Sequence, residues 1–339
     1  YLSKKLNNIA LITFDKRFNK FFDKRIKIIN SNFEKKKISK YFKYFICLII
    51  LVRELIKSEK ISVISFQANM YCIFLSIFFN FKLIVRSNSS PSGWTKNFLK
   101  NYIFKIFFKF PNFVIVNSSE FKNEMKKKFN VNAKLIYNPL NLNEIKKKSK
   151  KKIKLDFFKN KNYKKIINIA RFTDQKDHLT LLKGFLLASQ NEKLKLLIIG
   201  YGPNKSKIFE FIKKNKLERV VKVMSFQENP YKYLKKSDLF ILSSKFEGLP
   251  NVLLEAMSLK KFIISTNCPT GPREILNNGK YGLLFKIGDH KKLSRLILEY
   301  SKNQNKFNKL VINGYKSLKK YDYKNNCEKY LNLINKINH

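Results

Sequence analysis

Two carboxylates eight positions apart, Glu247 and Glu255, carry the clearest chemical signal in the sequence. They flank a turn between an apolar run at 238–243, which is typical of a buried strand, and a helix expected over 251–257. Pro250 suits a first helical position, so Glu255 falls on the second turn of that helix and Glu247 in the loop before it. In open parallel sheets, ligands bind where such loops leave the carboxyl ends of the strands.

This arrangement suits a ligand rich in hydroxyl groups. Gly248 permits an unusual backbone turn, and the unpaired N–H groups at the helix start can bind an anion or a sugar hydroxyl. Two carboxylates can accept hydrogen bonds from further hydroxyls. The alternative is a capped surface helix with two solvated glutamates and no ligand.

Two cations lie five positions apart where another predicted strand turns into a helix. Arg171 ends the strand at 166–171, and Lys176 precedes a helix expected over 177–189. The planar Arg fork and the Lys point charge can both reach a diphosphate. Surface solvation is the alternative, and it fits a Lys in this Lys-rich chain better than one of the few Arg at a strand end.

Glycine-containing loops follow two more predicted strands. The strand at 194–199 runs into a Gly-x-Gly-Pro loop at 200–203, where glycines let the backbone approach a nucleotide or simply form a tight turn. The strand at 262–265 is followed by Thr270 and Gly271, which lead into another helix start with free amides.

The first half of the chain also alternates apolar strands with helix-length segments, after a helix tail at 1–6. This order predicts a parallel sheet covered by helices on both faces. The strands are expected at 9–14, 26–29, 61–66, 83–85, 113–116 and 135–137, and the helices at 41–58, 68–80, 95–109 and 119–129. Three helices, at 289–301, 304–320 and 323–338, are expected to end the chain.

Segment 245–255 resembles the Glu-x7-Glu signature of the retaining glycosyltransferases of family 4, and further matches follow in order along nearly all of the chain. The resemblance implies an α/β protein with the GT-B fold, in which two Rossmann-like domains with parallel sheets face a central cleft. The second domain would bind a nucleotide-sugar donor, and the first would bind the acceptor. The enzyme would transfer the sugar to a hydroxyl with retention of anomeric configuration.

The resemblance also gives roles to individual residues. Glu247 would be the catalytic residue in contact with the donor sugar, and Glu255 would bind the ribose. Arg171 and Lys176 would hold the diphosphate. The remaining donor contacts would be Gly202, Gly248, Leu249, Pro250, Thr270 and Gly271.

On the acceptor side, the loop at 85–94 is similar to one that faces the cleft in the family. Arg86 and Asn88 are its candidate acceptor contacts. Arg86 equally fits a structural ion pair within the first domain.

Four segments follow from this reading of the chain: an acceptor-side domain over 1–142, a solvated Lys-rich linker over 143–155, a nucleotide-sugar domain over 156–320, and a helix over 321–339 that crosses back to the first domain. In the family, a first strand and a glycine-rich loop precede the point where this chain begins with Tyr1. The resemblance therefore implies that the N-terminus is truncated.

The Pro-Thr-Gly-Pro-Arg-Glu form at 269–274 resembles a family 4 subgroup that builds bacterial glycans. The expected donor is a UDP-linked hexose or N-acetylhexosamine, and the expected acceptor is a glycan or a polyprenyl-linked glycan. Arg273 would contact either phosphate or only Glu274 and nearby backbone. No metal or other cofactor is expected, because Arg171, Lys176 and helix-start amides can stabilise the departing diphosphate and no Asp-x-Asp motif is present.

The formal net charge of +48 predicts a salt-sensitive attraction to anionic membranes or polyanions. Specific nucleic-acid binding is not expected, since Arg is scarce and neither zinc-finger spacing nor a nucleic-acid-binding motif is present. The charge does support an alternative function, in which a non-catalytic protein of the same fold binds polyanions or membrane surfaces.

Two helices, at 41–53 and 101–110, mix aromatic side chains with Lys. Such helices either lie in a lipid headgroup layer or pack on the sheet with their Lys side chains directed outward. The longest apolar run, at 44–52, is far shorter than the roughly 20 residues that span a bilayer. Four scattered Cys fit reduced thiols. We therefore expect a cytoplasmic protein at the inner face of the cytoplasmic membrane.

Overall fold

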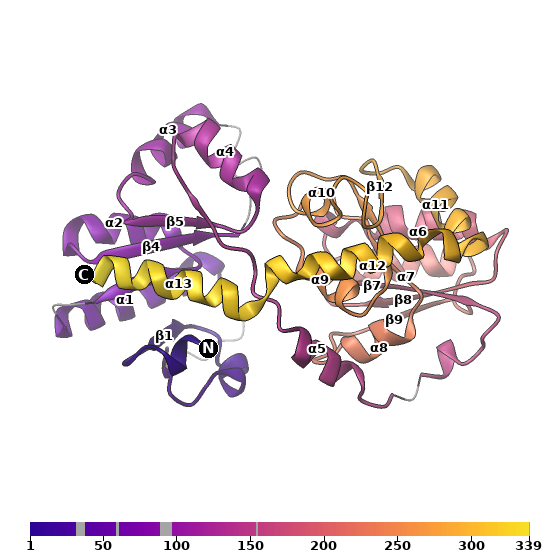
Figure 1. Cartoon of the computed structure of the whole chain (residues 1–339), viewed down its shortest axis with the longest axis horizontal. Coiled ribbons are helices and arrows are strands. Elements are labelled where there is room, and N and C mark those ends of the chain that lie inside the picture. The colour runs from indigo at the N-terminus through magenta and orange to yellow at the C-terminus, as the bar shows by residue number, and fades with distance from the viewer. Residues whose placement is uncertain (32–37, 59–60, 89–96, 154, 339) are drawn as a thin grey trace. The chain divides into compact units, whose positions relative to one another are not determined.

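Parallel strands alternate with helices throughout the chain, which a computed structural model describes over residues 1–31, 38–58, 61–88, 97–153 and 155–338 (Figure 1). The chain divides into two units. Unit 1 comprises Tyr1–Asn117, Lys122–Ile136 and Lys324–His339, and unit 2 comprises Ser118–Phe121 and Tyr137–Tyr323. Apart from Ser118–Phe121, the chain passes from unit 1 to unit 2 between Ile136 and Tyr137.

Unit 1 contains two parallel sheets. A two-stranded sheet pairs β1 (Ala10–Thr13) with β2 (Lys27–Asn30), and a four-stranded sheet has the order β3-β4-β5-β6. The strands of the second sheet are β3 (Ser62–Ser65), β4 (Lys82–Ser87), β5 (Phe113–Val116) and β6 (Lys134–Leu135). The helices are α1 (Lys40–Lys57), α2 (Asn69–Phe79), α3 (Phe98–Phe107) and most of α4 (Ser119–Phe129). The helix tail expected at 1–6 is only a 3-10 turn at Leu2–Lys4.

Helix α13 (Tyr323–Asn338) packs against the four-stranded sheet of unit 1. Its buried side chains recur at the spacing of one helical face. They pack in one cluster with Ile84 of β4, Ile115 of β5 and Ile136, which follows β6. These side chains of α13 are Tyr330, Leu333, Ile334 and Ile337.

Unit 2 has one six-stranded parallel sheet of order β12-β11-β10-β7-β8-β9. Its strands are β7 (Lys164–Ile169), β8 (Leu194–Ile199), β9 (Val221–Met224), β10 (Leu239–Leu242), β11 (Phe262–Thr266) and β12 (Leu283–Phe285). The chain builds outward from β7 through β8 to β9, then returns to the other side of β7 as β10. The carboxyl ends of β7 and β10 therefore flank the topological switch point, where ligands bind in open sheets of this order.

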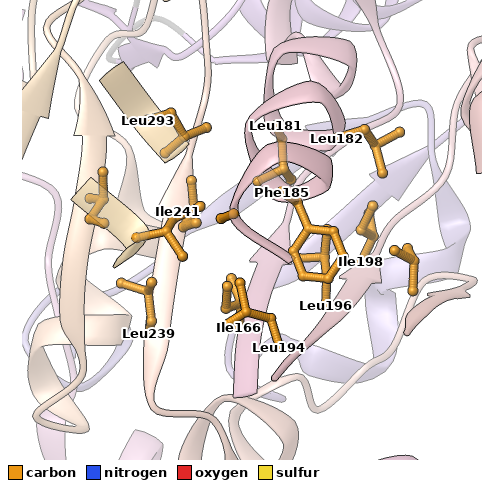
Figure 2. Close-up of a cluster of buried hydrophobic side chains, with 14 of the residues drawn as sticks. Ile166, Leu181, Leu182, Phe185, Leu194, Leu196, Ile198, Leu239, Ile241 and Leu293 are labelled. Carbon is orange, nitrogen blue, oxygen red and sulfur yellow. The ribbon is translucent and has the colours of Figure 1, made fainter. Parts of the chain in front are cut away.

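Alternate residues of the central strands are buried on opposite faces of this sheet. Ile166, Leu196 and Ile241 belong to a core cluster that also holds Leu181 and Phe185 of α6 (Figure 2). Their immediate chain neighbours Ile167, Leu197 and Phe240 belong to a second cluster on the other face. Burial on both faces explains why the strands read as nearly continuous apolar runs. The helices of unit 2 are α5 (Leu142–Ser149), α6 (His178–Ser189), α7 (Lys205–Lys214), α8 (Tyr231–Lys236), α9 (Asn251–Ser258), α10 (Pro272–Ile275), α11 (His290–Lys302) and α12 (Asn308–Ser317).

The Lys-rich stretch expected to be a solvated linker at 143–155 instead begins as helix α5. Asn141 caps it, since its side chain accepts a hydrogen bond of 3.1 Å from the N–H of Glu144. Ile145 is buried among the side chains of unit 2, while Lys146 and Lys147 are exposed. The amphipathic pattern prevails over the charge run. The helix expected over 304–320 is likewise broken, into α12 and 3-10 turns at Gln304–Phe307 and Leu318–Tyr321.

Truncation of the α13 core contact tests its contribution to unit 1. Ile334→Ala should lower the free energy of unfolding by about 2–4 kcal/mol, because it removes buried methyl groups and leaves a cavity. Asn335→Ala, at the adjacent exposed position of the same helix, should change it by less than about 0.5 kcal/mol. Urea unfolding followed by circular dichroism measures both, and equal effects would show that α13 is not anchored by this face.

Candidate active site

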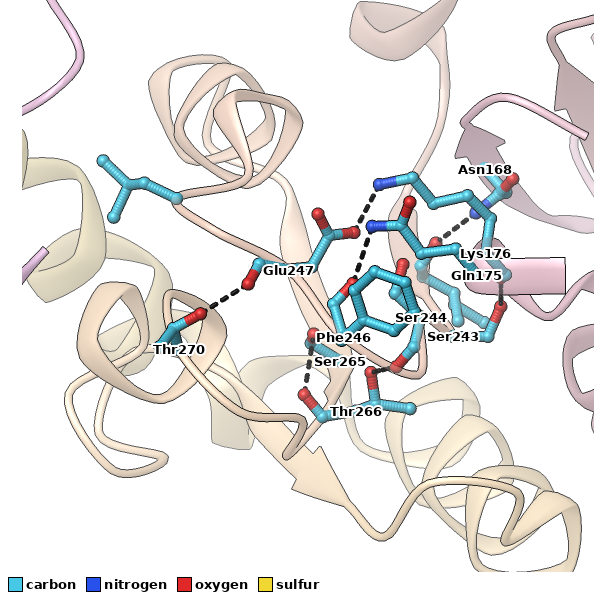
Figure 3. A network of polar contacts seen from close by, with 12 residues as sticks. Asn168, Gln175, Lys176, Ser243, Ser244, Phe246, Glu247, Ser265, Thr266 and Thr270 are labelled. Carbon is cyan, nitrogen blue, oxygen red and sulfur yellow. Dashed lines mark hydrogen bonds and ion pairs between the residues drawn. The ribbon is translucent and has the colours of Figure 1, made fainter. Parts of the chain in front are cut away.

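The carboxyl ends of β7 and β10 bring Lys176 and Glu247 together (Figure 3). Lys176 Nζ lies 2.5 Å from Glu247 Oε1, and the two side chains are only 14% and 6% exposed. Removing two charges from water is expensive unless their geometry is well fixed and other hydrogen bonds support them. An ion pair this buried therefore requires both loops to be held firmly.

On the lysine side, hydrogen bonds join the loop after β7 to the loop after β10. Ser243 Oγ donates to the carbonyl of Lys176 at 2.9 Å. Gln175 bridges in both directions: its carbonyl accepts from the N–H of Lys245 at 2.8 Å, and its Nε2 donates to the carbonyl of Phe246 at 2.9 Å. These bonds align the backbone on either side of the ion pair (Figure 3).

On the glutamate side, the loop after β11 supports the backbone of Glu247. Thr270 is buried, and its hydroxyl donates to the Glu247 carbonyl. Thr270 and Gly271 both have positive φ, +58° and +77°. A Cβ on Gly271 would lie 1.8 Å from the carbonyl oxygen of Gly248, so only glycine allows this approach. The unusual backbone expected at Gly248 is therefore found at Gly271, because Gly248 has no positive φ.

Helix α9 places Glu255 on its second turn, as expected. Pro250 is the residue before the first helical position, one place earlier than predicted. Among the described residues, no side chain caps this helix start, which leaves its first N–H groups available to a ligand. Leu249 and Pro250 are buried beside it.

Glu255 is partly buried and accepts a hydrogen bond of 3.3 Å from the hydroxyl of Tyr231. Burial raises the pKa of this carboxyl to about 7, against a smaller lowering by the Tyr231 hydrogen bond. A ligand that donates hydroxyl hydrogen bonds would favour the ionised form. Glu255 is thus suited to a ligand with donors, such as a ribose.

Arg171 and Gly202 follow β7 and β8, on the β7 side of the switch point. Arg171 is exposed just beyond β7, and Gly202 follows β8. A Cβ on Gly202, whose φ is +150°, would lie 2.4 Å from the carbonyl oxygen of Phe172. The glycine therefore lets two loops at this edge of the sheet pack directly on one another.

The helix start expected after Thr270 and Gly271 is weaker than predicted. Helix α10 has only four residues and begins with Pro272, which has no N–H. Arg273 Nε donates to Asn267 Oδ1 at 2.9 Å. Glu274 accepts from the N–H of Ser119 and the hydroxyl of Tyr137, both at 2.8 Å. This turn therefore contributes few amides to a ligand.

The predicted acceptor residues lie in unit 1 at the end of β4. The guanidinium of Arg86 lies 5.7 Å from the ring centroid of Phe66 and 5.9 Å from that of Tyr330. These cation–π contacts give Arg86 a structural role within unit 1. Asn88 is exposed, and residues 89–94 of the predicted loop lie outside the described residues.

Several residues of this site were not identified from the sequence. Ser243 and Gln175 have ordinary neighbours, and nothing local indicates which carbonyl each one reaches. Tyr231 is the first residue of α8, and its contact with Glu255 of α9 joins residues 24 positions apart, which no local pattern indicates. Over the described ranges, no group of three or more His, Cys, Asp and Glu could hold a metal ion.

Residues 149–317, about half of the chain and nearly all of unit 2, match the family model of the glycosyl transferases, group 1. This part of the chain belongs to the glycosyl transferases, group 1. The group 1 domain contains Arg171, Lys176, Glu247 and Glu255, and so the whole of the ion-paired edge.

Two similar proteins are also named as glycosyltransferases. The chain is 34% identical to an uncharacterized glycosyltransferase of Methanocaldococcus jannaschii, with 61% of this chain and 56% of the relative covered. It is 27% identical, with the same coverage, to the N-acetylgalactosamine-N,N'-diacetylbacillosaminyl-diphospho-undecaprenol 4-alpha-N-acetylgalactosaminyltransferase of Campylobacter jejuni. The chain thus spans just over half the length of these curated relatives.

Solved structures show the fold of nearly the whole chain. A glycosyltransferase from Rickettsia africae superimposes with a TM-score of 0.77 at 17% identity, covering 97% of this chain and 89% of that one. Anabaena HepE in complex with UDP gives a TM-score of 0.74 at 15% identity, covering 96% and 91%. The predicted α/β class with parallel sheets and the GT-B fold are confirmed.

Gly271 offers a matched test of the loop packing, because Gly288 has nearly the same φ (+78°) with nothing described within 4 Å of its Cβ position. Gly288→Ala should cost about 1–2 kcal/mol of stability, from the left-handed backbone alone. Gly271→Ala adds the collision with Gly248 and should cost clearly more in urea unfolding. Equal losses would show that the close approach of the two loops is not required.

Glu255 predicts a pH dependence of stability. Its pKa is higher in the folded chain than in the unfolded one, so its stabilising contribution is present below about pH 4.5 and is lost as the pH rises through 7. Relative to Glu255→Gln, the parent should lose about 3 kcal/mol between those limits. Urea unfolding at several pH values measures this difference, and a constant difference would contradict the raised pKa.

Proposed function

We propose that the chain is a retaining glycosyltransferase of family 4 that uses a UDP-linked hexose or N-acetylhexosamine. The acceptor is a hydroxyl of a glycan or polyprenyl-linked glycan in bacterial surface-glycan or glycoprotein-glycan assembly. The observation that carries this proposal is the buried Lys176–Glu247 pair at the topological switch point, with Arg171 on the same strand end.

The pair joins the two kinds of contact that a nucleotide sugar needs. Lys176 and Arg171 bind the diphosphate, and Glu247 accepts hydrogen bonds from the sugar hydroxyls. Because Lys176 Nζ and Glu247 Oε1 are 2.5 Å apart, a single donor can contact both groups where its sugar joins its phosphate. The bond from the anomeric carbon to the diphosphate oxygen breaks there, a bond to the acceptor hydroxyl oxygen forms, and the hydroxyl proton passes to the departing diphosphate.

The protein's own cations then take the place of a metal in stabilising the leaving group. Charge develops on the diphosphate as the bond breaks, and fixed cations in a poorly hydrated site stabilise it strongly. The first-turn N–H groups of α9 add to this field. Glu255 binds the ribose, while Gly202, Gly248, Leu249, Pro250, Thr270 and Gly271 shape the backbone around the donor.

The comparisons support the choice of donor. HepE was solved with UDP and with UDP-glucose, and several relatives are named as alpha-glycosyltransferases. UDP-hexoses are themselves alpha-linked, so alpha products correspond to retention. The C. jejuni relative's name includes a diphospho-undecaprenol acceptor. We further propose that Arg86 and Asn88 contribute to the acceptor side and that the protein works at the inner face of the cytoplasmic membrane.

The charge of +48 supports a second candidate, a non-catalytic protein of the same fold that binds polyanions or membrane surfaces. Lys146 and Lys147 of α5 are exposed and suit such a partner. This candidate predicts that binding depends on Lys clusters and is indifferent to Glu247.

The transferase is tested by nucleotide release from UDP- and GDP-sugars with and without glycan acceptors. Glu247→Ala and Arg171→Ala should each lower turnover about 10²–10³-fold, since each removes a contact to the reacting groups. Arg219→Ala, an exposed Arg elsewhere in unit 2, is the matched control and should leave turnover unchanged.

Nucleotide release and heparin binding by these variants separate the transferase from the polyanion-binding protein. Release with one donor, lost in both site variants, establishes the transferase, and an alpha product from that donor establishes retention. Turnover that survives Glu247→Ala would contradict the assigned role. Heparin binding that survives both site variants and falls on Lys146→Gln/Lys147→Gln, without any turnover, would favour the polyanion-binding protein.

A further inference from the structure

Helix α2 leaves an apolar stripe on the surface of unit 1. Tyr71, Phe74 and Phe78 are 47%, 50% and 67% exposed, and they are spaced three and four residues apart along one face. The ring centroids of Phe74 and Phe78 lie 4.8 Å apart, a distance typical of an aromatic pair. Cys72 and Ile73 face the core instead. The exposed stripe is therefore a second, separate face of a helix that is already anchored.

The neighbouring helices extend this apolar surface. Helix α2 lies beside both α1 and α3, and the Tyr44 and Tyr71 rings of α1 and α2 are 6.4 Å apart. Large apolar side chains on the two flanking helices are also exposed. They include Phe45 and Ile49 of α1, and Phe98 and Tyr102 of α3. A surface this apolar on a folded unit marks an interaction site.

The charges around the stripe select the partner. Helix α2 itself has no charged residue, whereas Lys40 and Lys43 of α1 and Lys100 and Lys105 of α3 are exposed on either side. Residues 38–110 carry eleven Lys and Arg against two Glu and no Asp. Two copies brought face to face would repel each other, while an anionic surface would attract this one.

A lipid surface also fits the dimensions. The eleven residues of α2 are about 17 Å long, about half the thickness of a bilayer core. Within the described part of the chain, no helix is both long and apolar enough to cross a membrane. Aromatic side chains beside Lys are typical of a helix that lies in the headgroup layer.

We propose that α2 is the membrane-insertion element of this protein. Its Tyr71, Phe74 and Phe78 enter the interfacial layer of an anionic bilayer, and the lysines of α1 and α3 contact the lipid headgroups. This inference deepens the membrane location included in the proposed function, but it is independent of sugar transfer. It also identifies a helix other than the two that the sequence indicated.

Vesicle flotation of the full chain tests the proposal without any nucleotide. The probes are vesicles of phosphatidylcholine alone and of phosphatidylcholine mixed with phosphatidylglycerol. The parent should bind only the mixed vesicles and dissociate on addition of salt. Phe74→Ser/Phe78→Ser should lower the partition coefficient about 10- to 100-fold, while Phe209→Ser/Phe226→Ser, which removes two exposed rings of unit 2, should not.

A third variant separates the two contributions. Lys100→Gln/Lys105→Gln should reduce the dependence on phosphatidylglycerol. Unchanged flotation of the α2 variant would overturn the proposal, and so would equal binding to both vesicles. Self-association in the absence of lipid that the α2 variant abolishes would instead identify a second copy as the occupant. Circular dichroism checks that each variant is folded, and nucleotide release in solution reports the transferase separately.

Discussion

The candidate active site depends on one contact, the ion pair between Lys176 and Glu247. The two residues are 71 positions apart and meet only because the chain returns to the opposite side of β7 to form β10. Both charges are largely removed from water, so the pair gains little unless its geometry is fixed and its surroundings are polar. The hydroxyls of Ser243 and Thr270 and the amide of Gln175 supply that fixation.

The sheet beneath the pair gives it a rigid base. Alternate residues of β7, β8 and β10 fill apolar clusters on both faces, so their carboxyl ends cannot shift independently. The ion pair and the side chains of Gln175, Ser243 and Thr270 that support it lie in loops beyond the strand ends, and the loop after β11 has positive φ at Thr270 and Gly271. The packed sheet thus stabilises unit 2, while the residues proposed to bind the ligand lie in the loops beyond it.

Much of the fold could be predicted from the sequence. Buried parallel strands have a distinctive apolar pattern, and the Glu-x7-Glu spacing identified the loop and helix that hold Glu247 and Glu255. Helix α5 was missed because its charge run masked the amphipathic placement of Ile145. The position of Gly271 against Gly248 was missed because a close approach between distant loops leaves no local pattern. The Lys176–Glu247 contact was missed for the same reason, although both residues had been identified.

The most direct test is a crystal structure of the chain bound to UDP. The diphosphate should lie within hydrogen-bonding distance of Arg171 and Lys176, and the ribose hydroxyls should donate hydrogen bonds to Glu255. The carboxylate of Glu247 should face the position that the sugar occupies in the full donor. UDP bound away from the ends of β7 and β10, without contact to Lys176 or Glu247, would contradict the role assigned to this ion pair.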